Sequence, residues 1–142
     1  MNAKKYLNQA IWLDQMINNK REQLESLMSL SMKVTSSFGK EKVSGGNIQK
    51  SKMESTIVKM MDLENELSSD IDRLVDLKKD MQDTINSMDD LNQQLLLELR
   101  YLGGKSWDEI AASMGYDPRT VYRIHGKALK EFEKMKRVSK CQ

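Results

Sequence analysis

The side chains best suited to chemistry follow the only proline of the chain, at position 118. Arg119 and Arg123 are four residues apart, so on a helix they project from one face. A guanidinium is a planar fork of donors that matches the two acceptors on the major-groove edge of guanine. Thr120 and Tyr122 lie between them and could reach a thymine methyl group or a phosphate oxygen. These four residues are our candidates for contact with nucleobases.

A second set of side chains suits contact with phosphate. Cations and hydroxyl groups bind phosphate oxygens whatever the base sequence, so they position a protein without reading the sequence. The candidates are Lys105, Ser106, Lys127 and Lys130. For each candidate in both sets, the alternative is an ordinary solvated side chain.

The distribution of charge places a polyanion-binding surface at the C-terminal end only. Residues 118–142 carry eight basic and two acidic side chains, although the net charge of the chain is only +2. Residues 53–98 carry four basic and twelve acidic side chains, and such a segment repels phosphate.

Two helix boundaries precede the candidate residues. The glycines at 103–104 supply the left-handed turn that ends a helix, so a first helix should stop at about Leu102. Ser106, followed three residues later by Glu109, has the spacing of a capping box. A second, short helix should therefore begin there.

A third helix should carry the candidate arginines. Gly115 permits a turn, Asp117 can cap the next helix, and Pro118 suits its first turn, where no N–H is needed. The three helices would share a small core. The side chains expected in it are Leu95, Leu99, Leu102, Ile110, Met114, Val121, Ile124 and Ala128.

Residues 95–129 read LLLELRYLGGKSWDEIAASMGYDPRTVYRIHGKAL. This segment resembles the C-terminal promoter-reading domain (region four) of bacterial sigma factors, in which EIA, a glycine, TV and AL recur at this spacing. It is more similar still to phage and prophage late transcription regulators of the ArpU and RinA type. No counterpart of sigma region two is present, so a complete sigma factor is not expected.

The resemblance implies a helix-turn-helix that binds double-stranded DNA and activates late phage genes, in contact with the RNA polymerase of a bacterial host. It also implies that the positions of Pro118, Arg119 and Arg123 face bases. The residues themselves do not decide between activation and repression.

Composition argues against other classes of protein. One cysteine and one histidine make a zinc site improbable, and we expect no metal or other cofactor. There is no P-loop, no dinucleotide glycine motif and no nucleophile with a base, so we expect no enzyme. With no apolar run of membrane length and no signal peptide, we expect a cytoplasmic protein.

The N-terminal part predicts a long amphipathic helix over residues 3–33, with Trp12 covering the flank of its apolar stripe. That stripe is Ala3, Tyr6, Ala10, Leu13, Ile17, Leu24 and Leu27, interrupted by Lys20. Residues 35–52 lose the periodicity and gather glycine and serine, which predicts a loop.

A seven-residue repeat follows, which is typical of a coiled coil. Its apolar members are Ile57, Met60, Leu67, Ile71, Leu74, Met81, Ile85, Met88, Leu95, Leu99 and Leu102. Glu64 occupies a seam position and could pair with Lys20. The alternative is that both side chains extend to solvent. A continuous helix over residues 53–102 would be about 75 Å long, against about 45 Å for the first helix. The alternative is a break at residues 87–90, where a serine and two aspartates could start a new cap.

We therefore predict an all-α protein with a long antiparallel helical hairpin, coiled-coil-like, over residues 1–90 and a helix-turn-helix over residues 91–142. The part of the long seam left uncovered predicts a homodimer.

Two further classes of function stay open. A DNA-packaging or assembly protein also joins coiled coils to helix-turn-helices, and a pure adaptor would contact RNA polymerase without binding DNA.

Three residues near the candidate set are better explained by packing than by binding. His125 is more typical of a packed, hydrogen-bonded residue than of a ligand, and Trp107 more typical of core or edge packing than of base stacking. Gly126, inside a predicted helix, suggests close approach by another element, most simply the first helix of its own domain.

Overall fold

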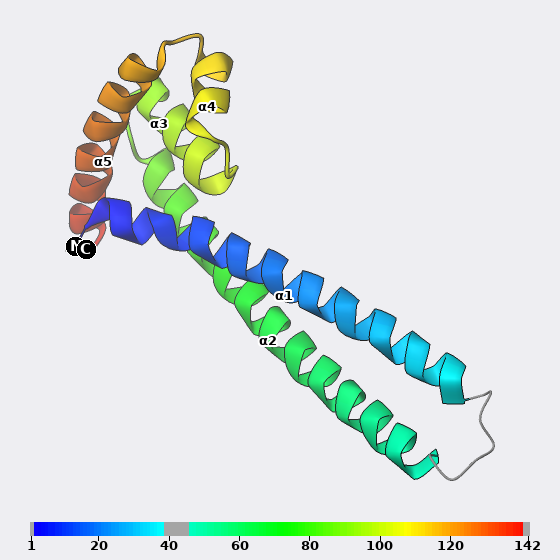
Figure 1. Ribbon diagram of the computed structural model, residues 1–142. Helices are drawn as coiled ribbons and strands as arrows, with labels where there is room; N and C mark the ends of the chain where they lie inside the picture. Colours follow the sequence, from blue (N-terminus) through cyan, green and yellow to red (C-terminus); the bar gives the residue numbers. More distant parts are fainter. Residues whose placement is uncertain (1, 39–45, 141–142) are drawn as a thin grey trace. The chain divides into compact units, whose positions relative to one another are not determined.

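The structure is a computed structural model that describes residues 2–38 and 46–140, with side chains at 2–33 and 50–137 (Figure 1). Over these ranges the chain is all-α, as predicted. The elements in chain order are α1 (Ala3–Phe38), α2 (Gly46–Asn86), α3 (Leu91–Leu97), the π-helix η1 (Glu98–Leu102), α4 (Trp107–Met114) and α5 (Pro118–Lys140).

Backbone contacts divide the chain into two units. One unit comprises residues 15–73, and the other comprises residues 1–14 together with 74–142. The beginning of α1 and the end of α2 therefore belong to the same unit as α3, η1, α4 and α5.

In the unit of residues 15–73, α1 and α2 lie side by side and run in opposite directions (Figure 1). Both helices extend into the segment predicted as a loop, because α1 continues to Phe38 and α2 begins at Gly46. The loop prediction was wrong in these flanks, since a segment without proline can stay helical although its apolar periodicity is lost. Residues 39–45 lie outside the described residues.

The buried face of α2 differs by one residue from the predicted seam at two positions. Leu63 and Asp70 are buried, whereas Glu64 is exposed and Ile71 is 37% exposed. Leu74, Met81, Ile85 and Met88 are buried as predicted, and Thr84 is buried beside Ile85. Apolar residues stand at adjacent positions of this helix, so two overlapping seams can be drawn through it. The phase is set by what the opposite helix presents.

A charged pair lies in this seam. Lys20 on α1 places its Nζ 2.5 Å from a carboxylate oxygen of Asp70 and 3.8 Å from one of Glu66. The predicted pair of Lys20 with Glu64 was therefore wrong, because Glu64 faces solvent. Each charge of this largely buried pair has its partner close by, so the pair can lie in an otherwise apolar seam.

Of the two possibilities for residues 53–102, a continuous helix or a break at residues 87–90, the break is confirmed. α2 ends at Asn86, and Asp90 caps α3 by accepting hydrogen bonds from the backbone N–H of Asn92 (2.9 Å) and Gln93 (3.2 Å). With 36 and 41 residues, α1 and α2 are about 54 and 62 Å long at ~1.5 Å per residue. The two helices are thus of similar length. The difference in length that was expected to leave part of the seam uncovered is therefore absent.

The core around α5 is also built from different residues than predicted. Leu96, Leu97 and Tyr101 are fully buried, whereas Leu95 is 43% exposed and Leu99 is only half-buried. The cap at Asp90 starts α3 afresh, so α3 does not inherit the register of α2. On the opposing helices, Ile110, Val121 and Ala128 are buried as predicted, and Phe132 joins them.

The start of α1 belongs to this same core. Ala3, Ala10 and Leu13 are buried as predicted, and Leu7, which the predicted stripe did not include, is also buried. Trp12 is 65% exposed and does not cover the flank of the stripe. The spacing explains this exposure, because Trp12 projects well away from the stripe around the helix axis.

A polar cluster of Tyr6, Asp80 and Lys136 joins α1, α2 and α5. The Tyr6 hydroxyl and the Lys136 ammonium both donate to one oxygen of Asp80, and the Tyr6 ring stacks on Phe132 with centroids 6.0 Å apart. The two donors, Lys136 first, lower the pKa of Asp80. Burial, followed by the hydrogen bond to Asp80, raises the pKa of Tyr6.

Candidate nucleic-acid interface

The start of α4 is held by η1 and the glycines that follow it. The N–H of Gly103 donates to the carbonyl oxygen of Glu98 (2.8 Å), and a Cβ at Gly103 would lie 3.0 Å from the carbonyl oxygen of Leu99. Gly104 has a φ of 67°, a conformation that side chains with a Cβ resist. The predicted helix end at Leu102 is confirmed.

The cap predicted at Ser106 is present, since its Oγ accepts a hydrogen bond from the N–H of Glu109 (3.2 Å). Arg100 supports this region from η1. One of its nitrogens donates to the carbonyl oxygen of Lys105 (2.9 Å), and its guanidinium carbon lies 4.6 Å from the ring centroid of Trp107. These contacts fix where α4 begins.

The turn between α4 and α5 follows the predicted positions. Gly115 ends α4 with a φ of 73°, and its N–H donates to the carbonyl oxygen of Ala111 (3.0 Å). Asp117 accepts a hydrogen bond from the N–H of Thr120 (2.8 Å), so α5 begins at Pro118. The hydrogen bonds from Thr120, with a smaller effect of the positive charge of Arg123, lower the pKa of Asp117. The carboxylate therefore remains a charged cap over a wide pH range.

The inward face of α5 is fixed by a buried polar contact. Nε2 of His125 and the hydroxyl of Tyr101 lie 2.7 Å apart, within hydrogen-bond distance, and Trp107 meets the histidine ring edge-on with centroids 4.7 Å apart. Burial, followed by the positive charges of Lys4 and Arg100, lowers the pKa of His125 to about 4. A neutral, hydrogen-bonded histidine thus locks the rotation of α5, in agreement with the structural role expected for it.

Trp107 also packs as expected at the edge of this core. It is half-buried, and its ring centroid lies 5.3 Å from that of Tyr122. Tyr122 is 55% exposed, so one side of its ring rests on Trp107 while much of it faces solvent.

The face of α5 opposite the core presents the predicted cations. Arg119 and Arg123 are exposed, and within the described part of the chain neither guanidinium forms a hydrogen bond or an ion pair. Thr120 is half-buried beside the cap of Asp117. The four residues predicted to contact phosphate are all exposed, and they are Lys105, Ser106, Lys127 and Lys130.

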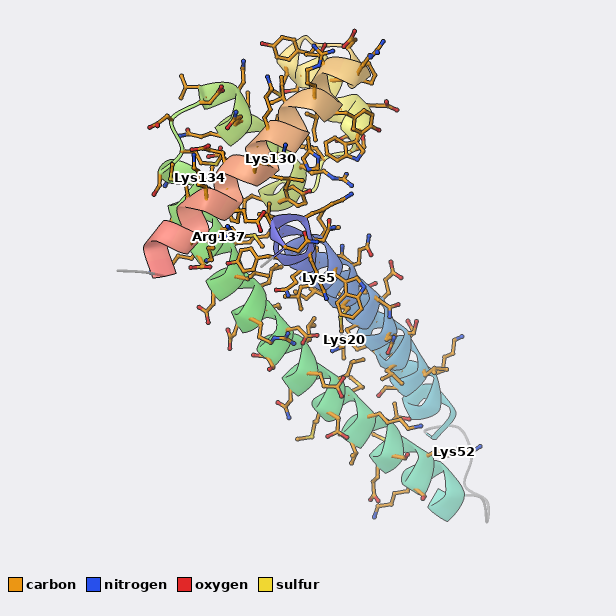
Figure 2. All side chains as sticks on the ribbon, turned by 90° about the vertical axis from the view of Figure 1, so that its left-hand side faces the viewer. Lys5, Lys20, Lys52, Lys130, Lys134 and Arg137 are labelled. Carbon is orange, nitrogen blue, oxygen red and sulfur yellow. The ribbon has the colours of Figure 1, made fainter. Side chains whose placement is uncertain are left out.

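The row of cations is longer than the predicted set. Lys134 and Arg137 are also exposed and follow Lys130 along α5 (Figure 2). Arg137 is paired with Glu133 (3.3 Å), which leaves Lys134 as the clearer addition. The spacing of four and three residues after Lys130 was visible in the sequence and would have found both.

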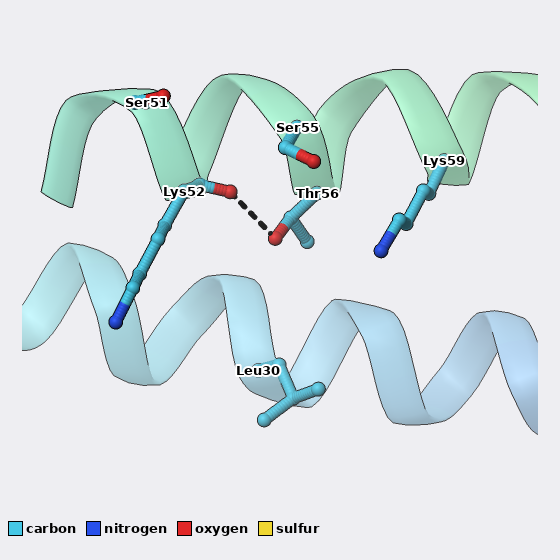
Figure 3. A pocket seen from close by; sticks show the side chains of 6 residues that line it. All are labelled: Leu30, Ser51, Lys52, Ser55, Thr56 and Lys59. Carbon is cyan, nitrogen blue, oxygen red and sulfur yellow. Dashed lines mark hydrogen bonds between the residues drawn. The ribbon is translucent and has the colours of Figure 1, made fainter. Parts of the chain in front are cut away.

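An open depression lies in the unit of residues 15–73, with a volume of about 430 Å³. Leu30 of α1 faces Lys52, Thr56 and Lys59 of α2 across it (Figure 3). The Thr56 hydroxyl donates to the carbonyl oxygen of Lys52 (2.8 Å). The depression thus offers two solvated ammonium groups and one leucine, a poor match to any site of convergent polar groups.

Two further features bear on the classes of function considered. The described residues hold no group of three or more histidine, cysteine, aspartate or glutamate side chains that could bind a metal ion. None of the described helices combines the length and the apolar character needed to cross a membrane.

The fold and the exposed residues define an all-α protein whose last helix presents a row of exposed cations, of which Arg137 is paired with Glu133. A family model described as a protein of unknown function, DUF1492, matches residues 33–133. The chain belongs to this family. No curated protein and no solved structure matches the chain.

Proposed function

We propose that the protein is a sequence-specific, double-stranded-DNA-binding transcriptional regulator, in which α4 and α5 form a helix-turn-helix and α5 enters the major groove. One observation carries the proposal. Arg119 and Arg123 project from the start of a helix whose rotation is fixed from behind by His125 and Tyr101, and within the described residues neither guanidinium forms a hydrogen bond or an ion pair, although Arg123 lies close enough to Asp117 to lower its pKa. Guanidinium groups held on a fixed helix face and available to bond are what base reading requires.

The roles of the side chains follow from their positions. Arg119 and Arg123 each offer a donor fork to the two acceptors of guanine, and Tyr122, supported by Trp107, offers its hydroxyl and ring edge beside them. Lys105 and Ser106 stand at the N-terminus of α4, where the ammonium group and the hydroxyl group could contact phosphate, although Asp108 and Glu109 in the same turn oppose an anion. Lys127 and Lys130 would contact the same sugar-phosphate backbone from α5.

The biological setting rests on the resemblance of residues 95–129 to sigma region four and to late regulators of the ArpU and RinA type. It supports a phage-encoded activator of late genes that contacts host RNA polymerase in the bacterial cytoplasm. The helices of residues 1–90, a hairpin in this proposal, would serve as its oligomerisation region.

A homodimer is part of the proposal. It is supported by the exposed apolar residues of α2 and no longer by a difference in helix length. Beside its buried face, α2 exposes two pairs of apolar residues at coiled-coil spacing, and the two seam positions between the pairs are Glu64 and Ser68. The apolar members of this interrupted row, Ile57, Met61, Ile71 and Val75, are 41, 58, 37 and 60% exposed. A row of this kind is suited to a second helix, and a second copy of the chain supplies one by two-fold symmetry.

The proposal is tested by capturing fragments of the protein's own genome with the purified full chain, at two salt concentrations. We expect one promoter-sized site to be recovered far above random duplex. Arg119→Ala or Arg123→Ala should weaken binding to that site by about 1 to 3 kcal/mol and leave binding to random duplex nearly unchanged. Arg73→Ala, which removes an exposed arginine from α2, is the matched control and should bind as the wild type does.

Other results would contradict the proposal. Failure to enrich any fragment at either salt concentration favours an adaptor that binds polymerase alone. Assembly of many chains into a ring favours a packaging protein. Equal losses on specific and random duplex would show that the two arginines contact phosphate and not bases.

A further inference from the structure

Nothing in the described structure requires a glycine at position 126. It lies in the interior of α5, is exposed, and has no positive φ. A Cβ built there would meet nothing within 4 Å, so the approach of another helix of the same domain, expected from the sequence, is wrong. Glycine is the least favourable residue in a helix interior after proline. If the missing side chain has a role, that role is in contact with a binding partner and not with the described chain.

The surroundings of Gly126 indicate what would approach it. Arg123 precedes it by three residues, and Lys130 follows it by four, so the three share one strip of the helix surface. Both cations are exposed, as is Lys127 beside the strip. A bare stretch of backbone framed by positive charges suits an anionic partner better than an apolar protein surface.

The distance along α5 agrees with this assignment. Gly126 lies seven residues beyond Arg119, which is a rise of about 10 Å. Gly126 lies on the same face of α5 as Arg119, two turns later. In recognition helices whose first turn contacts base edges, later turns can contact the sugar-phosphate strands that border the groove.

We propose that Gly126 is the point at which α5 comes into closest contact with the sugar-phosphate backbone of DNA. The missing Cβ lets the helix backbone approach the strand, while Lys127 and Lys130 neutralise phosphates beside it. The inference rests on the proposed function, since it requires α5 to lie in the major groove. It adds a steric requirement to a surface otherwise described by charge alone.

Two substitutions separate this steric role from charge and from folding. Gly126→Ala creates no clash inside the protein and favours the helix, so its melting temperature should rise by about 2 to 5 °C. On a labelled duplex that contains the site recovered by genome capture, the same variant should bind about tenfold or more weakly. Gly126→Lys adds a cation to a DNA-facing strip and should nevertheless bind more weakly than the wild type.

Ser69→Ala, an exposed substitution on α2 that also favours the helix, is the control and should leave DNA binding unchanged. The inference is overturned if Gly126→Ala binds as the wild type does, or if Gly126→Lys binds more tightly. In either case the proposed function would still stand as long as Arg119→Ala loses the specific site. A wild-type chain that binds no duplex would remove the proposed function itself, and the inference with it.

Discussion

At the scale of single residues, His125 connects packing to the surface proposed to read DNA. Its ring contacts Tyr101 and Trp107, and these contacts set which face of α5 points outward. The unfolded chain protonates a histidine near pH 6.5, whereas the folded protein keeps His125 neutral to about pH 4. The stability that comes from the neutral ring is therefore complete above pH 6.5 and is lost as the pH falls toward 4.

This difference predicts a pH-dependent stability. The free energy of unfolding should fall by about 1 kcal/mol between pH 7.5 and pH 5.5, since only the unfolded chain takes up the proton. Urea unfolding followed by circular dichroism at both pH values measures it. His125→Gln should be less stable at pH 7.5 and should lack this part of the decrease. An equal decrease in wild type and variant would assign it to other groups.

At the scale of elements, the two glycines at 115 and 126 show how position decides the effect of one residue type. Gly115 ends α4 with a φ of 73°, in the left-handed region. Gly126 lies inside α5 with ordinary helical geometry and open space around it. The first glycine is required by the backbone of the chain and the second is not.

Substitution by alanine should therefore change stability in opposite directions at the two glycines. Gly115→Ala should lower the free energy of unfolding by about 1 to 2 kcal/mol, because its Cβ crowds the following carbonyl in the left-handed region. Gly126→Ala should raise it by up to about 1 kcal/mol. Urea unfolding at one pH compares them, and Gly115→Asn should lose less than Gly115→Ala, since asparagine tolerates this conformation. A stabilising Gly115→Ala would contradict the assigned turn.

The same scale explains why α2 and α3 are separate helices. Asp90 accepts two backbone hydrogen bonds at the start of α3, and this local cap interrupts a repeat that the apolar residues alone would continue. The Gln94 side chain donates to the carbonyl oxygen of Met88, between α2 and α3. Lys78 donates to the carbonyl oxygen of Leu102 at the end of η1 (3.2 Å). Both carbonyl groups lie where a helix ends and backbone partners are lacking.

At the scale of the whole molecule, the apolar row of α2 beside its buried face predicts self-association. Sedimentation velocity on the full chain should show a dimer that dissociates on dilution. Ile71→Lys and Met61→Lys each place a charge in this row and should shift the equilibrium toward monomer, while Ser69→Lys should not. A wild-type chain that stays monomeric at every concentration would contradict the dimer.

The sequence by itself determined most helix boundaries of residues 91–140, because caps, positive-φ glycines and a first-turn proline act over three or four neighbouring residues. Ser106, Gly115 and Asp117 have their predicted roles for this reason, whereas the cap at Asp90 was only the alternative to a continuous helix. The exposure of Arg119 and Arg123 followed from the same local periodicity.

Only the tertiary structure decided which seam of α2 is buried, which carboxylate pairs with Lys20, and that Tyr101 meets His125. Each of these contacts joins residues at least 24 positions apart, and Lys20 and Asp70 are 50 apart. Two adjacent apolar rows satisfy the same spacing rule within α2. The choice between them depends on the face that a distant helix presents, which local spacing does not encode.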